Sequence, residues 1–361
     1  MSASGLMSIG VRAMNANYVG LQTSGHNIAN AGVEGYSRQQ VELQTALGQF
    51  TGAGFFGKGV DVQTVARVYD QFLTREAMTS RAQSSFDTAR LDRLQQLESV
   101  FAGGDDGIGQ AAGALLNAMA DLASHPQDLA ARNVVLGRAG ELAARFSSAA
   151  AQLDDIQSGM AQELGAQVTQ ANEIARQIAS VNDRIAIAQG TGHTPNDLLD
   201  LRDRLLSDLS SLVQITTVAA DDGSVAVFAG GGQRLVLGGQ ASQLQVAPDP
   251  YDASRVALGV LDGATVRPLS ASLVGGGSIG GLLRFQDEDL VSARTMLGQL
   301  GAAIAGSLNT QQSFGLDLGV PPGAGAPLFS IGPSCTTILS CGDLIFANRS
   351  TAAWRSFSSP R

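Results

Sequence analysis

The stretch VLGRAGELAARFSSAAAQLDDIQSGMAQELGAQVTQANEIARQIASVNDRI, residues 135–185, decides the fold of this chain. Apolar residues recur along it in alternating steps of four and three, which is the spacing of one face of a long helix. That face consists of Val135, Ala139, Leu142, Phe146, Ala149, Leu153, Ile156, Met160, Leu164, Val168, Ala171, Ile174, Ile178, Val181 and Ile185. A continuous helix of about 60 residues would be about 90 Å long, far longer than the usual helix of a globular domain. The stretch therefore predicts a rod-like helical bundle.

A second helix is predicted to run back along the first. In the turn QGTGHTPND, residues 189–197, Thr194 is the expected N-cap, Pro195 fits the first helical position and Asp197 stands where a capping-box acid belongs. The leucines that follow repeat at helical spacing and are Leu198, Leu201, Leu205, Leu209 and Leu212.

The pattern then changes to short strands. Residues from about 213 to 273 contain apolar segments such as SVAVFAG and RLVLGG, separated by turns such as DDGS and GGGQ, and they predict an antiparallel β meander. Helical spacing resumes over residues 276–315 and predicts a helix that returns to the bundle. Its apolar positions are Leu283, Leu290, Leu297, Leu300 and Ile304.

The N-terminal helix has a weaker apolar seam than the long helix. The seam follows alternating steps of three and four through Leu6, Ile9, Ala13, Ala16, Gly20, Thr23, Asn27 and Asn30. Glycines in a helix interior each cost about 1 kcal/mol relative to alanine, so this helix needs a partner surface to be stable. After it comes a polar segment, NIANAGVEGYSRQ, which we call the corner (residues 27–39), and then an alternating, glycine-rich hairpin up to Val68.

Together these patterns predict five segments. Residues 1–68 form the N-terminal helix, the corner and an extended hairpin, and residues 69–213 form the long helical bundle. Residues 214–275 form the β module, residues 276–315 the return helix, and residues 316–361 a linker and an atypical, disordered tail. The predicted fold class is mainly α with a smaller β part, as an elongated helical bundle or coiled coil that carries an antiparallel β meander module.

Composition excludes several classes of function. The 361 residues include 23 basic and 32 acidic side chains, a net charge of −9 that argues against nucleic acid as a partner. No apolar run is long enough to span a bilayer, and the N-terminus lacks the pattern of a Sec signal peptide. The two cysteines, Cys335 and Cys341, have neither metal-type spacing nor a disulfide framework around them, and we assign them no role.

Three patterns resemble sites of chemistry, and each has a simpler explanation. Glycines 52, 54 and 57 match a dinucleotide fingerprint, but the strand-like alternation after them predicts a hairpin tip instead. Ser278 lies in a GxSxG motif, but no histidine follows it in the chain, so a hydrolase triad of that type cannot be completed. Asp105 and Asp106 lack the glutamate of a calcium loop, and His26, His125 and His193 lack partners at ligand spacing. We predict no catalytic residue, no cofactor and no metal site.

The N-terminal segment SGLMSIGVRAMNANYVGLQTSGHNIANAGVEGYSRQQVEL, residues 4–43, resembles the segment shared by axial proteins of the bacterial flagellum. Four further stretches narrow the resemblance to the flagellar hook-associated protein 1 family, whose members join hook and filament. They are GKGVDVQTVARVYDQFL, HPQDLAARNVVLGRAGELAARF, PNDLLDLRDRLLSDLSSLV and GSIGGLLRFQDEDLVSARTMLGQLGAAIA. The resemblance covers about residues 1–331, with one departure at Val33 and Glu34, where the family commonly has Thr-Pro.

The resemblance implies a structural, non-enzymatic subunit needed for filament assembly. In the family, N- and C-terminal helices pair in the inner tube of the flagellum, and export follows the flagellar type III route. The implied partners are the hook protein, the second junction protein, further copies in a ring or helical layer, and an export chaperone that binds the C-terminal helix. The implied subunit-interface residues are Leu6, Ile9, Ala13, Ala16, Gly20, Asn27, Asn30, Gly35, Tyr36 and Arg38.

The end of the chain departs from this resemblance. Residues 333–361, PSCTTILSCGDLIFANRSTAAWRSFSSPR, hold both cysteines and the only tryptophan, and they show no heptad pattern where the family has a long amphipathic helix. Our hypothesis is a truncated product whose last residues are read from a shifted frame. Sequencing of gene and transcript that found no family-like coding in another frame downstream would contradict it.

Two other classes stay open on the residues alone. One is a secreted coiled-coil scaffold or adhesin unrelated to flagella, and the other is a hydrolase built around Ser278. Export that persists without the flagellar secretion system would favour the first, and a Ser278→Ala variant with unchanged behaviour would remove the second.

Overall fold

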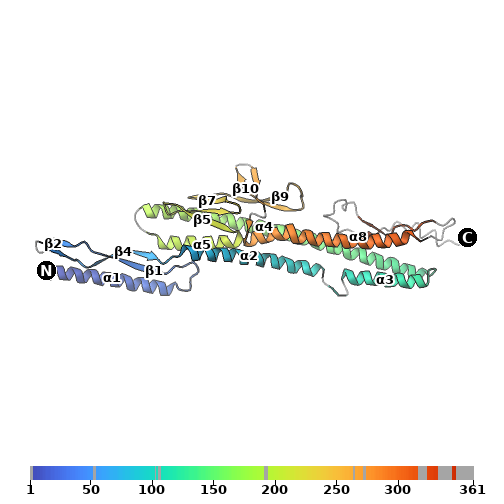
Figure 1. Ribbon diagram of the computed structural model, residues 1–361, viewed down its shortest axis with the longest axis horizontal. Helices are drawn as coiled ribbons and strands as arrows, with labels where there is room; N and C mark the ends of the chain where they lie inside the picture. Colours follow the sequence, from blue (N-terminus) through green and yellow to red (C-terminus); the bar gives the residue numbers. More distant parts are fainter. Residues whose placement is uncertain are drawn as a thin grey trace. The chain divides into compact units, whose positions relative to one another are not determined.

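The computed structural model describes residues 3–51, 54–101, 103–104, 107–190, 194–262, 265–270, 274–315, 323–331 and 344–346 (Figure 1). Tertiary contacts group the chain into two compact units, each of which we describe by itself. Unit 1 comprises residues 1–87, 165–251 and 256–281, and unit 2 comprises residues 88–164, 252–255 and 282–361. The five predicted segments follow secondary structure instead, and their boundaries stay a prediction.

Helices dominate the described residues, so the predicted class, mainly α with a smaller β part, is confirmed. They are α1 (Ala3–Ala29), α2 (Gln71–Val100), α3 (Ile108–Ser124), α4 (Leu129–Gly190), α5 (Asn196–Leu212), α7 (Gly277–Arg284) and α8 (Val291–Ser313). Helix α4 is continuous over 62 residues, which confirms the long helix expected from its heptad face. All predicted residues of that face are buried except the half-buried Ile156, next to which Gln157 is buried and donates to the carbonyl of Ser254.

Helix α5 begins one residue later than the sequence indicates. Thr194 is not the N-cap, because Pro195 occupies that position without a side-chain capping bond. The carbonyl of Pro195 instead accepts from the N–H groups of Leu198 and Leu199, both at 3.1 Å. The side chain of Asn196 donates to the carbonyl of Val65 at 2.6 Å, so a tertiary contact fixes the helix start where the sequence suggested a local cap.

The predicted antiparallel meander is present in unit 1, but it is divided between two sheets. The first sheet has the order β5-β6-β7-β8 and the second the order β11-β10-β9, with all pairs antiparallel. The strands are β5 (Ile215–Ala219), β6 (Val225–Ala229), β7 (Gln233–Leu237), β8 (Gln240–Ala241), β9 (Leu244–Pro248), β10 (Val256–Asp262) and β11 (Thr265–Pro268).

The side chains of two asparagines of α4 form hydrogen bonds with backbone groups of these sheets. Asn182 is fully buried, donates to the carbonyls of Val225 and Gly238 at 2.9 and 3.1 Å, and accepts from the N–H of Val225 at 3.1 Å. Asn172 exchanges two 2.8 Å bonds with the backbone of Leu244 in the same way. Each asparagine thus satisfies a sheet edge that would otherwise be buried with unpaired polar groups.

We expect Asn182→Ala to destabilise unit 1 by about 2–4 kcal/mol, because it leaves buried backbone groups of Val225 and Gly238 without partners. Denaturant unfolding followed by circular dichroism measures this loss. The exposed Asn133 supplies the control, since Asn133→Ala should change the free energy of unfolding by less than about 0.5 kcal/mol. Equal effects of the two substitutions would contradict the assignment.

The N-terminal part of unit 1 contains two antiparallel pairs. Strand β1 (Gln39–Thr45) pairs with β4 (Val60–Arg67), and β2 (Gln49–Thr51) pairs with β3 (Gly54–Phe56). Of the candidate dinucleotide glycines, Gly54 begins β3 and has a φ of +130° that other residues rarely adopt, whereas Gly52 lies outside the described residues. The predicted glycine-rich hairpin is confirmed.

The return helix contains an interruption that periodicity did not predict. A π-helical turn, η1 (Phe285–Leu290), separates α7 from α8. In unit 2 its carboxylates meet arginines from other elements: Asp289 lies 2.7 Å from Arg90, and Asp287 pairs with Arg255. The turn thus buries Phe285 and Leu290 while its acidic side chains hold neighbouring segments.

Part of the predicted tail is described. Strand β12 (Phe329–Ile331) pairs with β13 (Leu344–Phe346), a pairing that the sequence did not predict. Asn309 of α8 donates to the carbonyl of Phe329 at 2.7 Å and accepts from its N–H at 3.0 Å. Cys335 and Cys341 lie outside the described residues, as do Asp105, Asp106 and His193.

Candidate functional site

The corner is built around Asn27, near the end of α1. Its side chain donates to the carbonyl of Gln39 and accepts from the N–H of Gln39, both at 2.8 Å, so it closes the loop as a β-bridge would. The hydroxyl of Tyr36 donates to the same Oδ1 at 2.6 Å. Asn30 donates to the carbonyl of His26 at 2.9 Å, and the ring of His26 meets Tyr36 edge to face at 5.6 Å. These residues form one polar cluster that reverses the chain.

Gly35 is required at this reversal for two separate reasons. Its φ is +83°, which is strained for any residue with a side chain. In addition, a Cβ atom at this position would lie 2.8 Å from the Cβ of Arg204 on α5. The glycine therefore permits both the turn and the close approach of the corner to α5.

An ion-pair cluster, which we call the Arg67 clamp (Ser37, Arg67, Asp200 and Asp203), joins the corner to α5. The Nε of Arg67 lies 2.8 Å from Oδ1 of Asp200, and its Nη2 contacts Asp203 and donates to the hydroxyl of Ser37 at 3.0 Å. The N–H of Ser37 donates to Asp200 at 3.2 Å. The Arg67 side chain is only 7% exposed, so these charges are desolvated and depend on one another.

Burial dominates the electrostatics of the clamp. Desolvation raises the pKa of Asp200, although Arg67 and the N–H of Ser37 act in the opposite direction. Desolvation also raises the pKa of Tyr36, and the nearby carboxylate of Asp200 adds to this effect. The ionised form of Asp200 is therefore stabilised by the facing charge of Arg67 and not by contact with water.

This shift predicts how Asp200→Asn depends on pH. A raised folded-state pKa means that the contribution of Asp200 to stability is complete below its unfolded pKa of about 3.9 and is lost as pH rises through the folded pKa. We therefore expect Asp200→Asn to lower the free energy of unfolding more at pH 4 than at pH 7. Urea titrations of both proteins at the two pH values measure the difference. A penalty that grows toward pH 7 would contradict the direction.

The predicted seam of α1 faces the chain's own hairpin over part of its length. Ala16 and Thr23 are buried, Ile9 is half-buried beside Gly59, and Arg12 pairs with Asp61 at 2.5 Å. Of the other proposed interface positions, Gly20, Asn27, Asn30, Gly35 and Tyr36 are partly exposed, whereas Leu6, Ala13 and Arg38 are exposed. The structure thus brings only part of the predicted set together, and the role of the set in subunit contacts stays a prediction.

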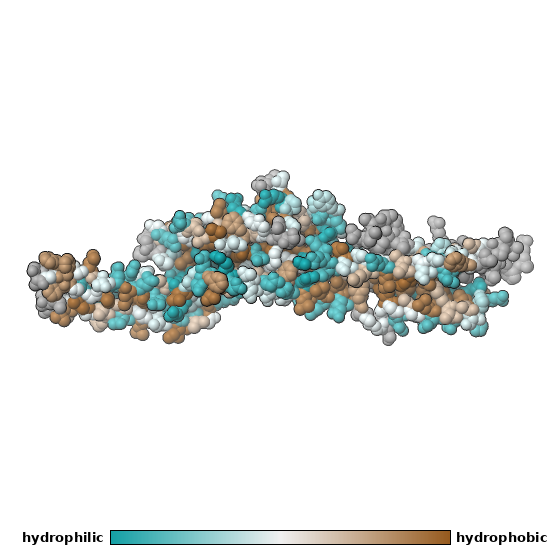
Figure 2. Space-filling view, viewed as in Figure 1, coloured by the Kyte–Doolittle hydropathy of each residue, from teal (hydrophilic) through white to brown (hydrophobic). Residues whose placement is uncertain are grey.

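A second seam on α1 carries larger apolar side chains and faces outward. We call it the exposed seam; it repeats in steps of four and three as far as Leu21 and then in one step of seven, across Gly25. Each member is between 59% and 78% exposed: Met7, Val11, Met14, Tyr18, Leu21 and Ile28. Figure 2 shows hydrophobic side chains gathered along α1. Such spacing is that of a coiled-coil face, and so large a row of exposed apolar groups marks a surface for a partner.

Sequence reasoning missed the clamp and the exposed seam. Arg67 lies in the predicted hairpin, and Asp200 and Asp203 lie in the predicted helix that runs back along the long one, but neither pattern singled out their charges. The signal for the clamp was available in part, since Asp200 and Asp203 are spaced to share one helix face, but their basic partner is more than 130 residues away. The residues of the exposed seam lie one or two positions beyond those of the predicted seam.

The remaining motifs do not build a second site. Ser278 begins α7 and its hydroxyl donates to Oε1 of Gln167 at 2.7 Å, where a hydrolase would place a base. Among the described residues no cluster of three histidine, cysteine, aspartate or glutamate side chains could hold a metal. None of the described helices combines the length and the apolar character that crossing a bilayer requires.

These features define a mainly helical protein in which a polar corner ties the N-terminal helix and hairpin to α5. Comparison with known proteins gives the family. The family model of the flagellar hook-associated protein FlgK helical domain matches residues 94–329, well over half of the chain. The chain belongs to the FlgK family.

Individual relatives agree with this assignment. Flagellar hook-associated protein 1 of Escherichia coli K12 is 33% identical over 332 residues, covering 91% of this chain and 60% of that protein. The protein of the same name from Bacillus subtilis is 32% identical over 213 residues, covering 56% of this chain and 42% of that protein. The solved structure of the flagellar hook junction protein FlgK from Burkholderia pseudomallei matches with a TM-score of 0.65 and 30% identity, over 72% of this chain and 46% of that one. The chain thus spans about 60% of the length of the first of these relatives.

Proposed function

We propose that this chain is a structural subunit of the bacterial flagellum that acts at the junction between hook and filament. The exposed seam of α1 carries the proposal, because a row of apolar side chains at coiled-coil spacing is a surface for another helix. Burying each large side chain there would contribute about 1.5–3 kcal/mol. The membership of the FlgK family supports this role, since the Burkholderia relative is described as a hook junction protein.

The corner and the Arg67 clamp would give that seam a fixed direction. Asn27 and Tyr36 reverse the chain, and Arg67 ties the reversed segment to Asp200 and Asp203 of α5. An arm held in this way presents its apolar seam without first having to be ordered, which reduces the entropic cost of docking. The proposed partners are the hook protein, the second junction protein and further copies of this chain, and an export chaperone would act before assembly.

The proposal also covers how the protein is exported and that it is not an enzyme. Export through the flagellar type III system to the hook–filament junction is the proposed path. A non-enzymatic role is supported by the family's structural character and by the hydrogen bond of Ser278 to Gln167. The alternative of a scaffold or adhesin unrelated to flagella is not supported by the family.

Co-sedimentation with isolated hooks tests the proposal. We expect the chain to pellet with hooks, and Met14→Asp or Leu21→Asp to weaken this binding at least about tenfold, because a buried carboxylate without a partner is costly. Asn15 is exposed on α1 and lies at least about 100° around the helix axis from Met14 and Leu21, so Asn15→Asp is the matched control and should bind normally. Binding that is equally strong in all three variants would contradict a role for the seam.

A further inference from the structure

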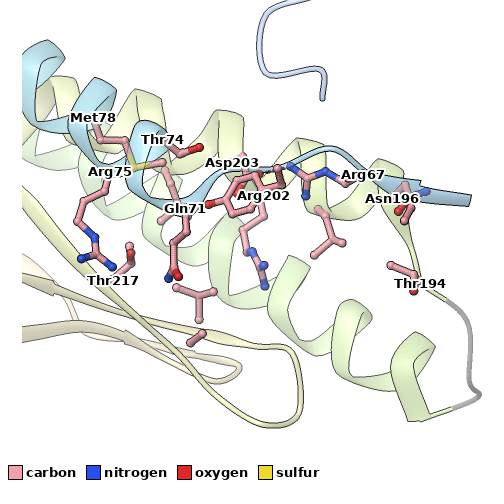
Figure 3. A pocket seen from close by; sticks show the side chains of 16 residues that line it. Arg67, Gln71, Thr74, Arg75, Met78, Thr194, Asn196, Arg202, Asp203 and Thr217 are labelled. Atoms are coloured by element: carbon pink, nitrogen blue, oxygen red, sulfur yellow. Dashed lines mark hydrogen bonds and ion pairs between the residues drawn. The ribbon is translucent and has the colours of Figure 1, made fainter. Parts of the chain in front are cut away.

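A cavity of about 360 Å³ lies in unit 1 beside the Arg67 clamp, and neither the fold nor the proposed assembly role uses it. Residues of β4, α2, α5 and β5 line it, among them Arg75, Asn196, Arg202 and Thr217. Figure 3 shows the side chains of Gln71, Arg75 and Arg202 extending toward the strand that carries Thr217. Polar groups from three elements therefore converge on one partly open cavity, as is usual for a small-molecule site.

Three buried side-chain atoms in this lining lack a hydrogen-bond partner in the described part of the chain: Nε of Arg67, Nε of Arg202 and Oδ1 of Asn196. Nε of Arg67 lies 2.8 Å from the carboxylate of Asp200, which leaves the atoms of Arg202 and Asn196. Arg202 is only 8% exposed; its Nη1 donates to the carbonyl of Gly223 at 2.6 Å, whereas its Nε has no hydrogen-bond partner in the described part of the chain. Oδ1 of Asn196 also has no hydrogen-bond partner in the described part of the chain, although Nδ2 of the same side chain donates to the carbonyl of Val65. A buried donor and a buried acceptor left unsatisfied in one cavity are unusual in a native protein. They favour a ligand that supplies both a hydrogen-bond acceptor and a hydrogen-bond donor.

The charge of the lining indicates the sign of that ligand. Arg67 is neutralised by Asp200 and Asp203. Neither Arg75 nor Arg202 has a carboxylate within ion-pair distance among the residues that the structure describes, but Asp203 also lines the cavity and stabilises the charge of Arg202 over a longer distance. Two guanidinium groups at one cavity favour an oxyanion, for which their planar N–H donors are suited.

We propose that this cavity, the Arg202 pocket, binds a small organic oxyanion, either a carboxylate or a phosphate ester, that also carries a hydroxyl group. The oxyanion accepts from Nε of Arg202 and from Arg75. The hydroxyl donates to Oδ1 of Asn196 or contacts Thr217. The pocket lies beside the Arg67 clamp, so a bound anion would also add to the stability of that part of unit 1.

Isothermal titration calorimetry of the full chain tests the proposal with three probes. Citrate carries carboxylates and a hydroxyl, glycerol 3-phosphate carries a phosphate ester and hydroxyls, and glycerol carries no charge. We expect at least one of the two anions to bind saturably with a Kd below about 1 mM, and glycerol not to bind. The anion that binds more tightly identifies the source of the oxyanion.

Variants locate the binding. Arg75→Gln should weaken it about tenfold, as expected for loss of a hydrogen bond to a charged group, and Arg202→Lys should abolish it although the charge is kept. Thr217→Val is a second test in case the buried Arg202 variant fails to fold. Arg184 is exposed on α4 outside the pocket, so Arg184→Gln is the control and should leave binding unchanged.

The proposal is overturned if neither anion binds saturably, or if glycerol binds as well as they do. It is also overturned if Arg75→Gln and Thr217→Val bind as the unmodified chain does, because the anion is then an adventitious ion only.

Discussion

Replacing Arg67 by methionine is expected to lower the free energy of unfolding of unit 1 by about 3–5 kcal/mol, because it removes the ion-pair partner that two nearly buried carboxylates share. The Asp200 and Asp203 side chains are 13% and 12% exposed, and both lie in contact with Arg67. Without it they must ionise unpaired or bind protons, and the hydroxyl of Ser37 loses a donor as well. Urea unfolding followed by circular dichroism measures the loss at pH 7.

The matched control restores electrical balance without restoring the arginine. In Arg67→Met combined with Asp200→Asn, the one remaining carboxylate of the clamp, Asp203, still faces the charge of Arg202, so part of the lost stability should return. If Arg67→Met alone lowers the free energy of unfolding by less than about 1 kcal/mol, the charges of the clamp are not desolvated. That result would contradict the role of the clamp in holding the corner.

Replacing Gly35 by alanine is the second large effect that we expect. The left-handed backbone costs a residue with a Cβ about 1–2 kcal/mol, and the contact at 2.8 Å with the Cβ of Arg204 adds about 1–3 kcal/mol of overpacking. The corner should therefore separate from α5, with faster amide exchange at Ser37, whose N–H donates to Asp200 in the intact clamp.

Gly32 offers a control within the same loop. A Cβ atom there would meet nothing within 4 Å, and its φ is not in the positive range, so Gly32→Ala should leave exchange at Ser37 and the free energy of unfolding nearly unchanged. Similar effects of Gly32→Ala and Gly35→Ala would show that any added side chain destabilises the loop and that the close approach of α5 has no role.

The regular elements could be predicted from the sequence because their signals are local. The heptad face of α4 repeats over many turns, and the glycine-rich hairpin tip and the strand turns are encoded within a few residues. The division of the meander into two sheets was not predictable in this way, because Asn172 and Asn182 select the strands that meet α4 through bonds across 43 to 72 residues.

The candidate site was predictable only in part. Asn27, Gly35 and Tyr36 stood out because small and polar residues interrupt a helix there, and the structure places them in one corner. The attachment of that corner to α5 depends on Arg67, which contacts Asp203 from 136 residues away in the sequence. The role of the predicted seam of α1 in subunit contacts stays a prediction. Small residues of that seam lie next to the hairpin, and the larger apolar residues, one or two positions further along, are exposed.

Photo-cross-linking in assembled hooks tests the central claim, that the exposed seam of α1 is covered by another subunit. A photoreactive amino acid at Met14, which is 71% exposed in the chain by itself, should form cross-links to a flagellar protein only after incorporation. The same group at Asn15, which is exposed but lies about 100° around the helix axis from Met14, should cross-link weakly or not at all. Equal cross-linking at the two positions, or none at Met14 in assembled hooks, would contradict the account.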